Sequence, residues 1–192
     1  YPSPIDIDTF VTDSTGTLML PEPLPFGNYE LYEQQSPWGY VFDGEPVPFV
    51  VDGTQDVITV EKYNIAQKGT ITVSKEGEVF SHVAEAGGLY QPQYEVQGQP
   101  GAVYDVTALE DIVTPDGTVN LKAGELAATL TTGSDGTATS EPLYLGRYQI
   151  LERTAQDGMV IDPEPKEVTL SYAGQEVEIT SASVGFVNER QK

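Results

Sequence analysis

The sequence contains few of the residue types that enzymes commonly use as nucleophiles or metal ligands. It has one histidine, His82, and no cysteine, which excludes a cysteine nucleophile and any metal site built from several histidines or cysteines. His82 lies in the run Val-Phe-Ser-His-Val, typical of an ordinary strand residue. The acid pairs Asp6 with Asp8 and Asp52 with Asp56 do not have the spacing of a calcium loop, which favours solvated surface acids. We therefore expect no metal and no cofactor.

A better candidate for chemistry is the set Lys75, Glu152 and Asn188. Lys75 ends the alternating run Ile-Thr-Val-Ser-Lys, and Asn188 ends the last strand-like segment. Glu152 follows Tyr148 and Ile150 at even spacing, so it shares their face of a strand, which should be the buried one. Burying a lysine, a carboxyl group or a carboxamide alone is costly, which favours a meeting of the three in one core. Three separate surface residues are the alternative.

An internal repeat defines the elements that would position these residues. Residues 24–46 and 143–165 match at a constant offset, and a repeat of this length indicates two domains. We assign residues 1–66 to a truncated domain and 67–192 to a complete one with an insertion at about 76–100. Nine positions hold identical residues in the two copies. In the first copy they are Leu24, Gly27, Tyr29, Glu33, Gly39, Val41, Asp43, Glu45 and Pro46.

The first domain repeats part of the candidate set. Glu33 and Asn64 occupy the positions of Glu152 and Asn188, but no lysine precedes Lys62. The first domain begins in the middle of the repeat, so we expect its opening strands upstream of this sequence.

The two domains are joined by a short linker, and the pattern at its start recurs at the end of the sequence. Six residues separate Asn64 from Ile71, which should restrain the domains end to end. Because Gln191-Lys192 repeats Gln67-Lys68, we expect a further domain to follow.

The predicted fold is all-β, with each domain an antiparallel, immunoglobulin-like sandwich. The sequence is rich in Val, Thr and Tyr and has 14 Pro and 19 Gly, which favours short strands and tight turns over long helices. Turn signals such as Pro-Asp-Gly separate the alternating segments. Period-two alternation occurs at residues 29–33, 71–75, 102–108, 125–131 and 148–152.

Charge and composition restrict the partners. The net charge is −21, from 30 acidic against 9 basic residues, so a nucleic acid or an anionic membrane surface would be repelled. No apolar run approaches 18 residues, so we expect no membrane insertion by this fragment. Without cysteine, no disulfide can brace the domains.

The repeated motif resembles a known family. Gly-x-Tyr-x-Leu/Ile-x-Glu, then Gly-Tyr or Gly-Met, then a last strand ending in Asn, is similar to the B-type repeat of collagen adhesins (Cna B-type). The same SpaA-like, prealbumin-like domain builds the shafts of Gram-positive pilins. The resemblance covers most of the second domain and the first domain from its middle onward. It implies two tandem prealbumin-like sandwiches.

The resemblance also implies a covalent cross-link. In this family a lysine on the first strand bonds to an asparagine on the last, and a glutamate on a central strand promotes the reaction. These residues correspond to Lys75, Asn188 and Glu152, with Lys68 as the alternative lysine. Burial favours the neutral, nucleophilic amine, and the glutamate can relay protons until ammonia leaves. The protein would then modify itself once, without turnover, and would not be an enzyme.

We weighed three functions. The first is a structural stalk of an adhesin or pilin on the cell-wall-anchored surface of a Gram-positive bacterium, with neighbouring tandem domains as partners. A glycosidase built on Glu33 or Glu152 is disfavoured because both glutamates recur inside a predicted core strand. The alternative is an adhesive module that binds a host glycan or matrix protein through aromatic side chains. The candidate aromatic residues are Phe80, Tyr90 and Tyr94 in the insertion and Trp38 in a turn.

Overall fold

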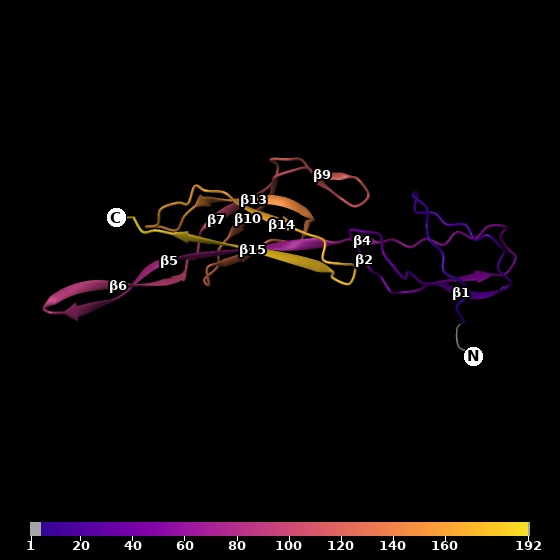
Figure 1. The fold of residues 1–192 in the computed structure, drawn as a ribbon, viewed down its shortest axis with the longest axis horizontal. Helices are drawn as coiled ribbons and strands as arrows, with labels where there is room; N and C mark the ends of the chain where they lie inside the picture. Colours follow the sequence, from indigo (N-terminus) through magenta and orange to yellow (C-terminus); the bar gives the residue numbers. More distant parts are fainter. Residues whose placement is uncertain (1–4, 192) are drawn as a thin grey trace. The chain divides into compact units, whose positions relative to one another are not determined.

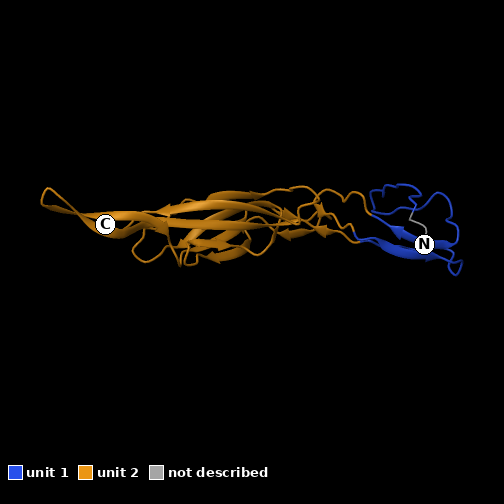
Figure 2. Ribbon diagram, turned by 90° about the horizontal axis from the view of Figure 1, so that it is seen from below, with its two compact units in different colours: residues 1–32, 45–62 blue, residues 33–44, 63–192 orange. Residues whose placement is uncertain are grey.

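The computed structural model describes residues 5–191, which form two compact units (Figure 2). Unit 1 comprises residues 1–32 and 45–62, and unit 2 comprises residues 33–44 and 63–192. The turn segment 33–44 therefore belongs with the second sandwich. The repeat boundary at residues 66 and 67 stays a prediction about how the two sequence repeats divide.

Unit 1 is a small two-stranded structure. Strand β1 (Gly27–Leu31) pairs antiparallel with β3 (Val47–Val51), and the rings of Tyr29 and Phe49 stack with centroids 5.5 Å apart. None of the described side chains of unit 1 is fully buried. A two-stranded sheet without a second layer has little apolar surface to bury, which explains the open packing of this unit.

Unit 2 contains the second sandwich, which has two layers (Figure 1). One sheet has the order β10-β7-β13-β14, and in the other β5 pairs with β6, β11, β12 and β15. The strands are β5 (Lys68–Ala86), β6 (Leu89–Gly98), β7 (Val103–Ala108), β10 (Leu126–Thr131), β11 (Thr137–Thr139), β12 (Leu143–Tyr144), β13 (Gly146–Thr154), β14 (Lys166–Leu170) and β15 (Ile179–Asn188).

Two short pairs complete this unit. Strand β2 (Tyr40–Val41) pairs antiparallel with β4 (Ile65–Ala66), and β8 (Ile112–Val113) pairs with β9 (Val119–Leu121). The described residues are therefore strands and turns, as predicted, and include no helix that could span a membrane. The all-β prediction is confirmed.

One strand pair runs parallel. β15 lies beside β5 in parallel register, whereas the other ladders between named strands are antiparallel. Period-two alternation carries no information about strand direction, so the sequence analysis could not distinguish this pair from the rest.

The core lies between the two sheets of the second sandwich. Buried residues alternate with half-buried or exposed ones along β7 and along most of β13. The fully buried apolar side chains all belong to residues 71–186, with Tyr104, Tyr148 and Phe186 the largest.

The predicted insertion forms a long hairpin. β5 continues past the sandwich to Ala86, turns at Gly87 and Gly88, and returns as β6 (Figure 1). Both glycines have positive φ, 63° and 78°, which a tight hairpin turn requires. Most side chains of the hairpin beyond Phe80 are exposed.

Candidate cross-link site

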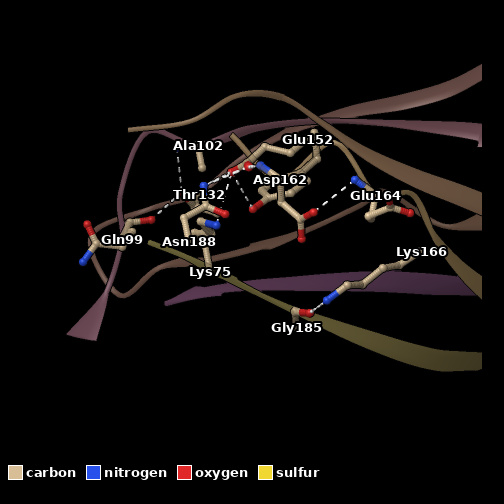
Figure 3. A network of polar contacts seen from close by, with 11 residues as sticks. Lys75, Gln99, Ala102, Thr132, Glu152, Asp162, Glu164, Lys166, Gly185 and Asn188 are labelled. Carbon is tan, nitrogen blue, oxygen red and sulfur yellow. Dashed lines mark hydrogen bonds and ion pairs between the residues drawn. The ribbon is translucent and has the colours of Figure 1, made fainter. Parts of the chain in front are cut away.

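The three predicted residues meet between the two sheets (Figure 3). Lys75 on β5 and Asn188 at the end of β15 lie on adjacent strands, and Glu152 on β13 faces them from the other sheet. In the parallel register Lys75 pairs with Phe186, two residues before Asn188. Residues two apart point to the same face, so both side chains enter the core.

The backbone around Lys75 is held by a close approach of two turns. The Lys75 N–H donates to Gly136 O at 2.7 Å, and its carbonyl accepts from Gln99 N at 2.9 Å. Gly136 has φ +79°, and a Cβ there would lie 2.5 Å from Lys75 O and 2.6 Å from the Gly98 Cα. Glycine is required at this position because another side chain would displace the strand that carries Lys75.

Glu152 contacts the other polar groups of the site. Its Oε1 lies 3.3 Å from Lys75 Nζ, and Asn188 Nδ2 donates to Oε1 at 3.0 Å and to Oε2 at 2.8 Å. The Tyr104 hydroxyl donates to Oε1 at 3.2 Å, and the Asp162 N–H donates to Oε2 at 2.7 Å. The carboxylate is therefore within hydrogen-bonding distance of both groups that would react.

The site is dry. Lys75 has no exposed surface, and Glu152 and Asn188 are each 2% exposed. Burial lowers the pKa of the Lys75 ammonium, and the charge of Glu152 opposes part of that decrease. Burial, followed by the charge and hydrogen bond of Glu152, raises the pKa of Tyr104, which keeps its hydroxyl protonated as a donor. The lysine is thus shifted toward the neutral amine that a nucleophile needs.

Two buried polar atoms of this site lack hydrogen-bond partners among the described residues. They are Asn188 Oδ1 and Lys75 Nζ, which has its ion pair with Glu152 at 3.3 Å but no hydrogen bond. Buried polar atoms are nearly always satisfied, so a pair of unpartnered ones in the same site is unusual. The structure places Asn188 Nδ2, and not the carboxamide oxygen, against Glu152. Both oxygens of Glu152 accept from Nδ2, so the carboxamide presents its donor to the carboxyl group.

The counterpart of this site in the first repeat is partly assembled. Asn64 Nδ2 donates to Glu33 Oε1 at 2.8 Å, and Ser36 Oγ donates to Glu33 Oε2 at 2.9 Å. Asn64 Oδ1 is buried without a hydrogen-bond partner, as Asn188 Oδ1 is. The pair therefore repeats the Glu–Asn geometry of the second sandwich.

The alternative lysine lies elsewhere. Lys68 pairs in register with Ile179 at the opposite end of β15 from Asn188. Its Nζ lies 4.5 Å from the centroid of the Tyr144 ring, a cation–π contact. The structure thus brings Lys75, and not Lys68, to Glu152.

The aromatic residues considered for ligand binding are spread over two regions. Phe80, Tyr90 and Tyr94 lie on the long hairpin, where Phe80 and Tyr94 meet edge to face at 6.1 Å. Trp38 lies in the turn segment of unit 2, with its ring 5.3 Å from that of Tyr172. His82 is exposed on the hairpin. The described part of the chain holds no cluster of three or more potential metal ligands.

Two contacts to Glu152 were missed by the sequence analysis. Tyr104 lies on the inward face of an alternating strand, so its burial could be predicted. Its contact with Glu152 on the neighbouring strand could not. The Asp162 contact uses the backbone N–H, which leaves no signature in residue type.

Comparison with known families identifies the class of protein. The model of the SpaA prealbumin-like fold domain matches residues 3–67 and 94–183, more than half of the chain. The chain therefore belongs to this family, which confirms the resemblance seen in the repeated motif. The matched ranges include Glu33, Asn64 and Glu152 but not Lys75 or Asn188. No curated protein matches the chain significantly in sequence.

A solved structure shares the fold. The TIE protein of Bacillus anthracis matches with a TM-score of 0.52 and 23% identity, covering 87% of this chain and 26% of its own. This chain thus spans about a quarter of that protein. The major pilin SpaD of Corynebacterium diphtheriae matches with a TM-score of 0.42 and 21% identity over 65% of this chain and 30% of its own. BcpA, the major pilin subunit of Bacillus cereus, matches with a TM-score of 0.37 and 17% identity, over 77% of this chain and 33% of its own.

Proposed function

We propose that this chain is part of a structural stalk of a pilin or adhesin on the surface of a Gram-positive bacterium. We further propose that its second sandwich is cross-linked by an amide between Lys75 and Asn188. The observation that carries this proposal is the buried contact of a lysine, a glutamate and an asparagine on the first, central and last strands. Membership of the SpaA family and the tandem repeat support the stalk role.

The proposed reaction is a single transamidation. Lys75 passes a proton to Glu152 across their 3.3 Å contact, and the neutral amine attacks Cγ of Asn188. A C–N bond forms as the bond from Cγ to Nδ2 breaks. Glu152 already holds Nδ2, so it can return the proton to the leaving nitrogen, which departs as ammonia. Glu152 then takes the second proton from the attacking nitrogen, which becomes the amide N–H. Folding supplies the proximity that an unactivated amide requires.

The residues around Glu152 have positioning roles in this proposal. The Tyr104 hydroxyl and the Asp162 N–H fix the carboxylate between the two reacting groups. The reaction happens once per molecule, so the chain is not an enzyme with turnover. The first repeat has Glu33 and Asn64 without a preceding lysine, so we propose no cross-link there within this chain.

The product suits a stalk under tension. The amide would join two neighbouring parallel strands, so force applied at the ends of the sandwich would be carried by a covalent bond. Neighbouring domains of the same protein are the proposed partners. An acidic surface without cysteine fits an extracellular stalk that is stabilised without disulfides.

Intact mass tests the cross-link directly. Loss of ammonia should leave the folded chain roughly 17 Da lighter than its sequence. Peptide mapping should find Lys75 joined to Asn188. A full sequence mass, or ammonia lost from a different residue pair, would overturn the assignment.

A further inference from the structure

Within unit 2, Gln67 holds the loop between β14 and β15. Its side chain is 1% exposed. Nε2 donates to Gly174 O at 2.9 Å and to Val177 O, and Oε1 accepts from Ala173 N at 2.8 Å. Both ends of the carboxamide are thus satisfied by the backbone of one loop.

The turn segment 33–44 holds the same loop from beside Gln67. Gln175 accepts from Ser36 N through Oε1 at 2.9 Å and from Phe42 N through its carbonyl at 2.8 Å. The Trp38 and Tyr172 rings meet at 5.3 Å. We call the turn segment 33–44 and Gln67 together the clasp. The clasp holds the loop between β14 and β15, residues 171–178, which we call the seated loop.

The backbone of the clasp has a defined geometry. Tyr40 pairs with Ala66 across β2 and β4, and Gln67 N donates to Gly39 O at 2.8 Å. Gly39 has φ +87°, and Tyr40 N donates to Pro37 O at 3.2 Å. This arrangement places the Gln67 side chain against the seated loop.

The same backbone geometry recurs at the other end of the second sandwich. Met159 pairs with Arg190 in an antiparallel bridge, and Gln191 N donates to Gly158 O at 2.9 Å. Gly158 has φ +83°, and Met159 N donates to Gln156 O at 3.0 Å. These contacts match the clasp position by position under the sequence repeat, so a second copy of the clasp is already folded.

The second clasp differs in having no loop seated in it within the described chain. Gln191 is exposed, and the bond that its side chain makes is a long one, from Nε2 to Met159 O at 3.3 Å. Gln67 in the equivalent place is buried by its three backbone partners. The two clasps therefore share a backbone conformation and differ in whether a loop is bound to the glutamine side chain.

We propose that residues 156–161 together with Gln191 are a docking surface for another prealbumin-like sandwich, joined directly after this one. Its loop equivalent to residues 171–178 would offer Gln191 two carbonyls and one N–H, as the seated loop offers them to Gln67. This proposal extends the stalk role by naming the partner and its contact, and it does not depend on the cross-link.

Two substitutions within the repeat set the strength of this second clasp. Ala155 takes the place of Ser36, whose contact to the loop uses the backbone N–H, so that bond is retained. Asp157 takes the place of Trp38 and cannot stack on a tyrosine such as Tyr172. The second clasp should therefore hold by hydrogen bonds and lack the aromatic contact.

The test uses the full chain extended by a copy of residues 69–192, so that Lys192 occupies the position of Lys68. Amide exchange at the copied Ala173 reports docking, because its N–H would donate to Gln191. We expect slow exchange, which becomes roughly tenfold faster in Gln191→Ala, the effect of losing one buried hydrogen bond. Gln67→Ala is the matched control, which should expose the original Ala173 in the same way.

Three results decide the proposal. Asp157→Trp should slow the exchange further by restoring the aromatic contact. Equal, fast exchange at the copied Ala173 with and without Gln191 would overturn the docking surface, as would independent tumbling of the appended sandwich in NMR relaxation. Intact mass reports the cross-links in the same samples, so loss of docking with retained ammonia release would separate this inference from the proposed chemistry.

Discussion

Substitution of Glu152 by glutamine would separate the cross-link from the fold. The glutamine side chain keeps the size of the original but cannot carry a proton between Lys75 and Asn188. We expect the variant to fold, to retain its full sequence mass and to lose stability. The contacts to Glu152 from Asn188 Nδ2 and the Tyr104 hydroxyl can be made by the amide oxygen, which limits the damage to packing.

The size of the loss follows from the loop that the amide closes. Residues 75 and 188 enclose about 113 residues, for which loop-closure entropy gives about 5 kcal/mol at 25 °C. For a domain of this size, that corresponds to a decrease in Tm of about 20 °C. Urea unfolding followed by tyrosine fluorescence, with intact mass measured on the same sample, provides the assay.

The control is Tyr104→Phe, which removes one hydrogen bond to Glu152 but leaves the three reacting groups. This variant should still lose ammonia and should be destabilised by only about 1 kcal/mol. The reasoning would be refuted if Glu152→Gln lost ammonia as the wild type does. It would also be refuted if that variant kept its full mass yet unfolded at the wild-type urea concentration.

Three further predictions concern the lysine, its turn and the first repeat. In the uncross-linked Glu152→Gln variant, the folded pKa of Lys75 lies below its unfolded value, so the folded state binds fewer protons and stability should rise with pH up to about 10.5. Urea midpoints from pH 7 to 10 test this. If adding Lys75→Met left the slope of stability against pH unchanged, the prediction would be contradicted. Gly136→Ala should slow ammonia release in refolding time courses, since its Cβ would strike Lys75 O; release at the wild-type rate would argue against that constraint. Limited proteolysis should remove unit 1 before the second sandwich, because no described side chain of unit 1 is fully buried, and a resistant core of residues 1–62 would reverse the assignment.

Much of the second sandwich was predictable because its signals are local. Alternation along β13 places Tyr148, Ile150 and Glu152 on one face, and the structure buries all three. The repeated motif predicted the prealbumin-like family, which the family model confirms. These features depend on period and on residue type, both of which a sequence displays directly.

Tertiary structure alone decided which residues meet. Lys68 and Lys75 lie on the same strand, and only the register against β15 places Lys75 near Asn188. The parallel direction of that pair, the orientation of the Asn188 carboxamide and the seating of a loop against Gln67 are long-range or geometric facts. A periodic pattern states which face of a strand is buried, but it does not state which strand lies opposite or in what register, because those depend on how the whole chain packs.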